Sequence, residues 1–255
     1  MAEGSAALLY EVVDAVARVT LNRPEKRNAL NDELIAELKA ALARSELDQS
    51  VRCVVITGAG ADFCSGADLS ALQKISKASV AENLEDARSL MDLFLLIREL
   101  RVPVISAVRG RALAGGCGLA LACDMVLAER SARFGFPEVK IGFVPAMVMA
   151  ILRRSVSEKI AFELMAAGEE ISAEQALNYG LVNRVWETAE FDAAVVEFAG
   201  KFRKLSRSAV ALSKRLFYRT DAIAFEEALA AGVDVNTTAR MTEDCQKGIA
   251  RFLQK

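Results

Sequence analysis

Apolar and polar residues alternate in blocks along the first half of the chain, and these blocks predict strands separated by helices. Residues 8–22 contain two β-rich pieces around Asp14-Ala15, a pattern that predicts a hairpin. Short apolar runs typical of buried strands follow at residues 51–58, 102–108 and 124–129. Because helical patterns lie between these runs, we expect βαβ units and a mainly parallel sheet.

Helical periodicity predicts the remaining elements. Residues 31–45 begin with Asn31 and two acidic residues, which suits a helix start, and one face is apolar: Leu34, Ile35, Leu38, Ala41 and Leu42. Residues 79–100 predict a longer helix. From Pro145 onward nearly every segment is expected to be helical: 145–154, 157–167, 172–179, 188–204, 206–218 and 224–253. This helical second half is expected to pack on the sheet or on a neighbouring subunit.

Composition narrows the class of protein. The 255 residues are 53% hydrophobic, enough for one large domain or one domain with an appendage. A net charge of −2 offers no strongly basic surface for nucleic acid. No apolar run is long enough for a membrane span, and the N-terminus lacks the basic start of a secretory signal. The five cysteines never form C-x-x-C, so we expect buried thiols in a reducing cytoplasm and no metal site.

The absence of histidine restricts the available chemistry most strongly. A chain with 0 histidines cannot use Ser-His-Asp or Cys-His nucleophilic catalysis, and it lacks the commonest metal ligand. GAGADF at residues 58–63 resembles the start of a dinucleotide-binding loop, but the third glycine of G-x-G-x-x-G is missing. If the protein is an enzyme, its acids and bases are therefore carboxylates, lysines, tyrosines or backbone groups.

Two of the predicted strands end in loops of small residues. GAGADFCSGADLS follows the strand at 51–57, and RGRALAGGCGLA follows the strand at 102–108. Ligands of open α/β sheets bind outside the carboxyl ends of strands, where such loops could expose backbone N–H groups to an anion. A helix beginning near Gly116 would add the positive end of its dipole. Tight helix–strand packing also selects glycine and alanine, so both interpretations are open.

Four ordered motifs resemble the enoyl-CoA hydratase/isomerase (crotonase) superfamily. They are LNRPEKRNALN, FCSGADLS, VPVISAVRGRALAGGCGLALACDMVLA and ARFGFPEVKIGFVP, and the similarity runs from about residue 8 to the C-terminus. The resemblance implies an α/β fold of the ββα-superhelix type, in which a spiral of ββα turns forms two stacked sheets. It also implies a spiral core with the acyl-CoA site in residues 1–195 and a helical region for trimerisation and site completion in residues 196–255.

The resemblance also implies roles for individual residues. The family binds acyl-CoA thioesters and stabilises an enolate with two backbone N–H groups, which match Ala67 and Gly115. The substrate-binding positions that match are Lys26, Arg27, Ala29, Ser65, Gly66, Asp68, Leu69, Leu113, Gly116 and Pro137, together with Phe252 and Lys255, which reach a neighbouring subunit's CoA. No cofactor is implied besides the CoA of the substrate. Without the resemblance, Lys26 and Arg27 would be interpreted as a solvated pair in a loop.

The segment FPEVKIG matches Glu138 to the family's common catalytic glutamate. Its neighbours Phe136, Pro137 and Val139 are apolar, so we expect burial to raise the pKa of the carboxyl toward neutrality, which suits proton exchange at an α-carbon. From the residues alone, a surface glutamate in a turn after proline would be the preferred interpretation.

The sequence departs from the family at Gly118. Hydratases of the family carry a second glutamate three residues after the oxyanion glycine, and the pair activates water. The nearest acidic residue on this loop is Asp124, which we expect to cap the far end of the apolar helix. Met147, Val148 and Met149 replace a glycine-rich run, and they either belong to the core or narrow the acyl pocket.

The sequence therefore predicts a cytoplasmic acyl-CoA enzyme of the hydratase/isomerase family with one glutamate as acid and base. Isomerisation or decarboxylation needs only this carboxylate, whereas hydration with one glutamate should be slow. A branched-chain hydratase and a non-catalytic CoA-binding member are the alternatives, and RNA binding is disfavoured by the acidic balance. We expect a homo-oligomer, either a trimer or a dimer of trimers, and no membrane association.

Overall fold

The predicted N-terminal hairpin forms, and it begins the main sheet. In the computed structural model, which describes residues 6–68 and 73–254, strand β1 (Leu8–Val13) pairs antiparallel with β2 (Val16–Leu21). Asp14 and Ala15 have φ angles of 51° and 63°. Positive φ at both central residues is what a two-residue hairpin turn requires, and aspartate tolerates this conformation better than most side chains.

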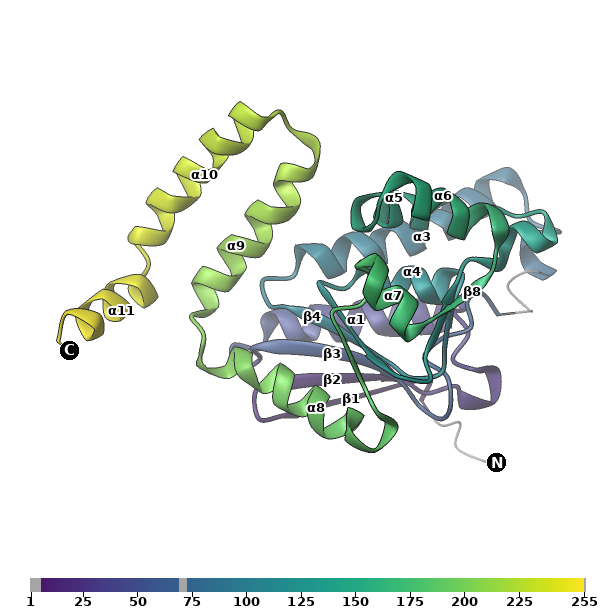
Figure 1. Ribbon diagram of the computed structural model, residues 1–255, viewed down its shortest axis with the longest axis horizontal. Coiled ribbons are helices and arrows are strands. Elements are labelled where there is room, and N and C mark those ends of the chain that lie inside the picture. Colours follow the sequence, from purple (N-terminus) through teal and green to yellow (C-terminus); the bar gives the residue numbers. More distant parts are fainter. Residues whose placement is uncertain (1–5, 69–72, 255) are drawn as a thin grey trace.

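The other long strands add to this hairpin in one six-stranded sheet. The order is β1-β2-β3-β4-β6-β9, with β3 at Cys53–Gly58, β4 at Val104–Val108, β6 at Met125–Glu129 and β9 at Arg184–Trp186 (Figure 1). Every pair from β2 onward is parallel, as the sequence predicted. Residues of β3 and β4 are almost all buried, which explains their continuous apolar sequences.

A second, smaller sheet was not predicted by the periodicity. It consists of β5 (Arg111–Leu113), β7 (Arg133–Gly135) and β8 (Glu170–Ser172), in that order. Strands of three residues are too short to show an alternating pattern, so their sequences gave no signal. After β4 the chain passes through β5 into helix α4 (Gly115–Ala122), and after β6 it enters β7. This succession of strands from both sheets followed by a helix is the ββα spiral that the resemblance implied.

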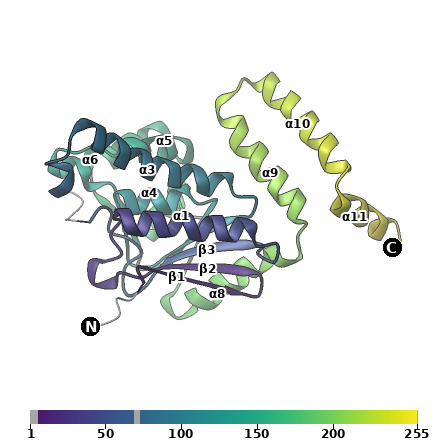
Figure 2. The same cartoon turned by 180° about the vertical axis from the view of Figure 1, so that it is seen from behind.

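Helices cover both faces of the large sheet (Figures 1 and 2). Helices α1 (Asp32–Leu47), α3 (Val80–Glu99) and α4 lie on one face, and α8 (Thr188–Gly200) lies on the other. The side chain of Asn31 caps α1 by accepting the Leu34 N–H at 3.0 Å. The five apolar residues predicted for the inner face of α1 are all buried: Leu34, Ile35, Leu38, Ala41 and Leu42.

Three shorter helices complete the spiral beside α4. They are α5 (Ala146–Ser155), α6 (Glu158–Ala167) and α7 (Ala173–Tyr179), within one residue of the predicted bounds. The predicted helix at 188–204 is α8 continued by a 3₁₀ turn at Lys201–Lys204. None of the helices in the described part of the chain is long and apolar enough to cross a bilayer.

The last three helices form an arm that extends from the spiral (Figure 1). Helix α9 (Arg207–Arg219) packs on α3, and α10 (Phe225–Arg240) and α11 (Glu243–Leu253) follow. The single helical segment predicted at 224–253 is therefore wrong in one respect, because it breaks between Arg240 and Glu243. The side chain of Thr242 accepts the Cys245 N–H at 3.3 Å and caps the start of α11, a signal that the apolar pattern alone did not show.

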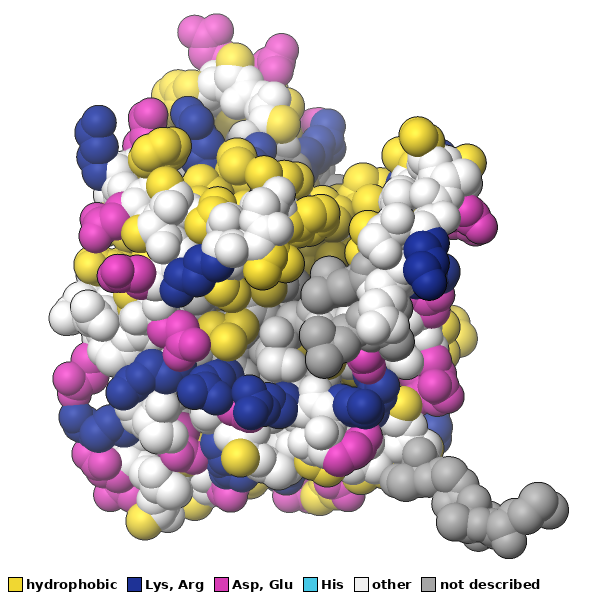
Figure 3. All heavy atoms as spheres, turned by 90° about the vertical axis from the view of Figure 1, so that its right-hand side faces the viewer, with side chains coloured by type: hydrophobic (Ala, Val, Ile, Leu, Met, Phe, Trp, Pro, Cys, Tyr) yellow, Lys and Arg dark blue, Asp and Glu magenta, His cyan; other side chains and the backbone are white. Residues whose placement is uncertain are grey.

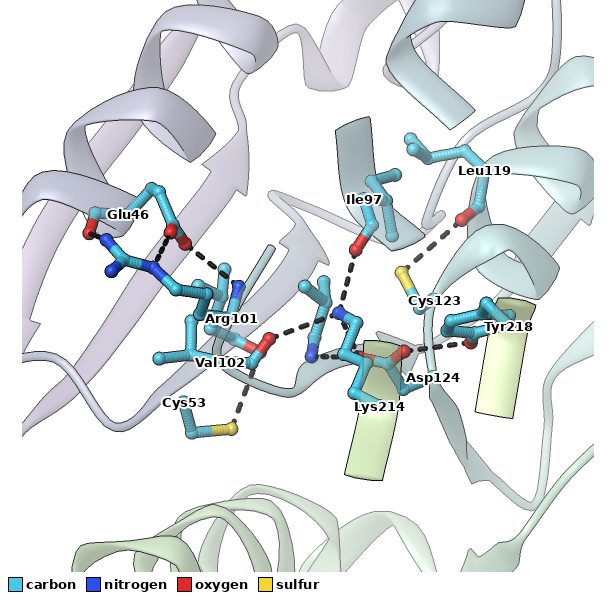
Figure 4. Close-up of polar contacts among 12 residues, drawn as sticks. Glu46, Cys53, Ile97, Arg101, Val102, Leu119, Cys123, Asp124, Lys214 and Tyr218 are labelled. Atoms are coloured by element: carbon cyan, nitrogen blue, oxygen red, sulfur yellow. Dashed lines mark hydrogen bonds and ion pairs between the residues drawn. The ribbon is translucent and has the colours of Figure 1, made fainter. Parts of the chain in front are cut away.

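A buried ion pair fastens α9 to the spiral (Figure 4). The Lys214 ammonium donates to Asp124 at 2.6 Å and to the carbonyl oxygens of Ile97 at 2.8 Å and Val102 at 3.1 Å. Asp124 also accepts the Val104 N–H at 2.6 Å and the Tyr218 hydroxyl at 2.8 Å. The expectation that Asp124 caps the end of α4 is thus wrong, because its carboxylate binds the arm and the sheet instead.

Candidate active site

The loop that follows β3 runs between two other segments, and this fixes the direction of the Ala67 peptide. The Leu30 N–H donates to the Gly66 carbonyl at 2.7 Å, and the Asp68 N–H donates to the Leu30 carbonyl at 2.9 Å. In such a parallel bridge, Leu30 uses the groups on either side of Ala67, so the N–H of Ala67 points away from Leu30. Ala67 is exposed, whereas Gly66 and Asp68 beside it are buried.

The start of α4 lies against this loop. Gly115 is the first residue of the helix, and first-turn N–H groups have no partner within their own helix. Ala114 precedes it with a φ of 49° and a ψ of −128°, a strained conformation for a residue with a Cβ. A Cβ added to Gly66 would lie 3.7 Å from the Gly115 nitrogen. The Ala67 and Gly115 peptides therefore belong to loops in direct contact, with the positive end of a helix dipole beside them.

Close packing explains some of the glycines in this region but not all of them. A Cβ on Gly116 would lie 2.7 Å from the Cys64 Sγ, and a Cβ on Gly118 would lie 2.5 Å from the Val148 Cγ2. Close packing thus requires glycine at both positions. At Gly115 the nearest atoms are side-chain methyl groups of Leu30 at 3.6 Å and Leu90 at 3.9 Å, which are ordinary contacts. Packing therefore explains Gly116 and Gly118 and leaves the glycine at 115 without a packing reason.

Glu138 lies in the 3₁₀ turn η2 (Pro137–Ile141), which is tied to the start of α4. The Ala114 N–H donates to the Gly135 carbonyl at 2.9 Å, three residues before Glu138. Pro137 suits the first position of the turn because that N–H needs no partner there. Burial is the main cause that raises the pKa of the Cys117 thiol, and the negative charge of Glu138 raises it further. The Glu138 carboxylate is therefore close to the first turn of α4.

Glu138 is buried, as its match to the family's glutamate and its apolar neighbours together predicted. The residue is 8% exposed, and burial raises the pKa of its carboxyl above the ordinary value of glutamate. Within residues 6–68 and 73–254, the structure gives Oε2 no hydrogen-bond partner. A buried carboxylate oxygen without a donor is costly in a purely structural role, which favours a functional one.

The position where hydratases of the family carry a second glutamate is closed. The space beside Gly118 is taken up by Val148 from α5 and by Phe94 from α3, whose Cζ would lie 3.1 Å from a Cβ. Both side chains are buried, at 4% and 5% exposure. Of the two interpretations of the Met147–Met149 stretch, core packing holds for Val148, while Met149 is exposed. No pattern in the sequence indicates that Phe94 and Val148 meet at this glycine.

The remaining predicted residues fall into three groups. Lys26 and Arg27 are exposed, close to the loop that follows β3. Backbone hydrogen bonds connect this region: the Ser65 N–H donates to the Arg27 carbonyl at 3.0 Å, and the Ala29 N–H donates to the Lys26 carbonyl at 3.1 Å. Leu113 and Gly116 lie within two residues of Gly115 in the chain, and Pro137 directly precedes Glu138. Phe252 is 79% exposed at the end of the arm, away from these residues, and Leu69 and Lys255 lie outside the described residues.

The side chain of Asp68 is used within the protein. Its carboxylate is buried and forms an ion pair with Arg23 at 2.7 Å. Sequence reasoning missed Arg23, although it stands in the motif LNRP, because nothing in the sequence indicates that this arginine turns inward.

Apolar side chains also gather on this side of the molecule. Figure 3 shows them in the middle and upper part of the face, with a band of Lys and Arg side chains below. Large apolar residues that are exposed on η2, the following loop and α6 include Ile141, Phe143, Val144 and Phe162. A separate cavity of about 180 Å³ lies on the opposite side of the large sheet, between α8 and β1–β3, and none of the predicted site residues lines it.

Comparison with known proteins shows the family to which the chain belongs. The model of the enoyl-CoA hydratase/isomerase family matches residues 11–255. The 2,3-dehydroadipyl-CoA hydratase of Escherichia coli is 36% identical over 94% of this chain and 92% of its own. The crotonyl-CoA hydratase of Syntrophomonas wolfei is 33% identical over 97% and 95%. The crystal structure of an enoyl-CoA hydratase from Mycobacterium smegmatis superposes with a TM-score of 0.93, at 34% identity and with 98% and 97% of the two chains covered. The chain belongs to the enoyl-CoA hydratase/isomerase family, with the crotonase fold.

Proposed function

We propose that the chain binds an acyl-CoA thioester with the carbonyl oxygen between the N–H groups of Ala67 and Gly115, and that Glu138 is the acid and base of the reaction. The observation that carries the proposal is the buried Glu138 carboxylate, whose Oε2 has no donor among the described residues and whose pKa is raised by burial. The Ala67 N–H points away from Leu30 and the Gly115 N–H lies in the first turn of α4, so we assign both as donors whose geometry is fixed before the substrate arrives.

In this mechanism Glu138 removes a proton from C2 of a 3-enoyl-CoA. The electron pair of the broken C–H bond moves into the conjugated thioester, and negative charge develops on the carbonyl oxygen. The two N–H groups stabilise that charge more strongly than the neutral carbonyl, so they lower the barrier. The protonated Glu138 then returns its proton to C4, and the double bond shifts to the 2-position. One carboxyl is sufficient because each step uses the same proton.

Isomerisation fits the site better than hydration. Hydration needs a second group to hold and activate water, and that position is Gly118, packed against Val148 and Phe94. Decarboxylation of a carboxyacyl-CoA would pass through the same enolate and uses the same two donors. Hydration is the second candidate, and the observation that favours it is that the named relatives in Escherichia coli and Syntrophomonas wolfei are hydratases.

The C-terminal arm supports a further part of the proposal, assembly into a trimer or a dimer of trimers. Large apolar side chains on α9, α10 and α11 are exposed in the single chain: Phe217, Phe225, Leu229, Val233, Ile249 and Phe252. Two other copies of the chain would cover them, and Phe252 would then reach the CoA of a neighbour. Light scattering of the purified protein tests this, and a monomer with full CoA affinity would contradict it.

Exchange of α-protons tests the proposed chemistry without assuming a final product. Butyryl-CoA has no double bond, so it can form the enolate but cannot isomerise or add water. The wild-type protein should exchange its C2 protons for deuterium in D₂O, and Glu138→Gln should abolish the exchange while CoA binding is kept. Binding without any exchange would instead indicate a non-catalytic CoA-binding protein.

A further inference from the structure

The guanidinium of Arg23 joins the two chain segments that contain Leu30 and Ala67. Nη1 donates to the Ala29 carbonyl at 2.6 Å, and Nη2 donates to Asp68 Oδ2 at 2.7 Å. The side chains of Arg23 and Asp68 are 16% and 8% exposed, so water screens this ion pair little. One planar group thus holds the residue before Leu30 and the residue after Ala67.

Asn28 reinforces this connection from within the same loop. It is fully buried, and its side chain accepts the Arg23 N–H at 2.9 Å. Its amide nitrogen donates to the carbonyl oxygens of Ala59 at 2.9 Å and Asp62 at 2.8 Å. The loop that contains Arg23 is therefore bound to the 59–62 turn, and the guanidinium begins from a fixed backbone.

The direction of the Ala67 N–H depends on this arrangement. Leu30 sets the plane of the Ala67 peptide through its bonds to Gly66 and Asp68, and the Arg23 contacts lie at the ends of that short bridge. A rotation of the segment around Ala67 would move Asp68 and strain its ion pair with the guanidinium, which the bond to Ala29 holds in place. Because a hydrogen bond weakens steeply with misalignment, a small rotation would reduce what this donor contributes to a developing oxyanion.

We propose that Arg23 is a positioning residue that holds the N–H of Ala67 in the direction needed to stabilise the thioester oxyanion. This inference rests on the proposed function, in which Ala67 is one of the two donors. Arg23 itself does not contact the substrate. It acts through the backbone, by binding Ala29 and Asp68 at the same time.

Two substitutions at Arg23 distinguish the contribution of the planar guanidinium from that of its positive charge. Arg23→Lys keeps a positive charge beside Asp68 but cannot reach both acceptors with the geometry of a guanidinium, and Arg23→Met removes charge and donors. Loss of one whole oxyanion donor lowers kcat by about 10²–10³-fold, so a misdirected donor should lower it by roughly 10–100-fold. KM should change little, because the substrate carbonyl gains most of its charge only in the transition state.

Arg109→Met is the matched control. Arg109 also binds two carboxylates, Glu129 at 2.9 Å and Asp192 at 2.8 Å, but these lie on β6 and α8, and Asp192 belongs to the face of the sheet opposite α4. The Arg109→Met variant tests whether the loss of any partly buried arginine lowers kcat. The control should keep the wild-type kcat, and a loss equal to that of the Arg23 variants would overturn the proposal. If Arg23→Met does not fold, Arg23→Lys and the control complete the comparison.

A spectroscopic readout distinguishes failure of this inference from failure of the proposed function. Butyryl-CoA labelled with ¹³C at the thioester carbonyl should show a downfield carbonyl shift when bound to wild type, because two N–H donors polarise the C=O bond. The shift should be smaller in both Arg23 variants and unchanged in Arg109→Met. A full shift and a wild-type kcat in the folded Arg23 variants would overturn the positioning role alone. A bound wild type without any shift would overturn the oxyanion hole and this inference with it.

Discussion

Placing a carboxylate at position 118 tests whether the second acidic position is merely unoccupied or physically closed. The Cβ of a new side chain would lie 2.5 Å from Val148 Cγ2 and 3.1 Å from Phe94 Cζ, so Gly118→Glu must displace both. Overpacking of this kind costs about 1–3 kcal/mol, and an unpaired buried charge costs roughly 3–5 kcal/mol more. The better helix propensity of glutamate returns less than about 1 kcal/mol. Since a whole domain is stable by about 5–15 kcal/mol, the single variant should be close to unfolded.

Removing the obstruction should relieve the overpacking, and the space that it opens admits water to the new carboxylate, which lowers the cost of burying its charge. Val148→Ala deletes two methyl groups, which costs about 1.6 kcal/mol in lost burial, and it opens the space that the new side chain needs. Gly118→Ala is the uncharged control, because it introduces only the Cβ. We expect Gly118→Ala and Val148→Ala to destabilise the protein separately, and the double variant to be more stable than additivity predicts by about 1 kcal/mol or more.

Urea unfolding and crotonyl-CoA hydration measure the two consequences. Among these variants, Gly118→Glu/Val148→Ala is the one expected to gain hydratase activity over wild type, because its carboxylate can hold water beside the substrate. A Gly118→Glu protein as stable as wild type would refute the packing argument. The argument would also be refuted if the loss of unfolding free energy in the Gly118→Ala/Val148→Ala variant equalled the sum of the losses in the two single variants.

Three further outcomes follow from the buried charges. Glu138→Gln should lower kcat by about 10²–10⁴-fold with CoA affinity kept, and near-normal turnover would assign the proton transfer to another group. Burial raises the Glu138 pKa, so ionisation of this carboxyl opposes folding. The free energy of unfolding is therefore highest below the pKa of the unfolded chain and falls as pH rises through the folded-state pKa. The Tm of Glu138→Gln should therefore exceed that of wild type at pH 8, and the gap should close near about pH 4, whereas a gap independent of pH would contradict the burial argument. Lys214→Met should cost about 3–5 kcal/mol in urea unfolding, and adding Asp124→Asn should recover part of the loss; no recovery would mean that the uncompensated charge is not the cause.

The sequence predicted those features that depend on residues close together in the chain. The hairpin at Asp14-Ala15, the apolar face of the helix after Asn31 and the long strands follow from local periodicity, and all are present. The small sheet was missed because strands of three residues carry no period. The spiral itself came from the resemblance, since a periodic pattern says nothing about the order in which two sheets share their strands.

Contacts between distant segments could not be predicted in the same way. Asp124 meets Lys214 across 90 residues, and Arg23 meets Asp68 across 45. Neither pairing has a signal in composition or spacing, and Asp124 was consequently expected to cap a helix. The burial of Glu138 was predicted only with the help of the resemblance, because its apolar neighbours alone also fitted a surface turn. The closure of the space at Gly118 was not predicted, because it depends on three helices meeting at one point.

Product identification from matched substrates is the most direct measurement of the central claim. Purified protein is supplied separately with 3-hexenoyl-CoA and 2-hexenoyl-CoA in D₂O, and the products are identified by NMR together with their kcat/KM values. Proton transfer by Glu138 predicts conversion of the 3-enoyl to the 2-enoyl thioester, with slow or no addition of water to the 2-enoyl substrate. Faster formation of 3-hydroxyhexanoyl-CoA than of the isomerised product would contradict the account.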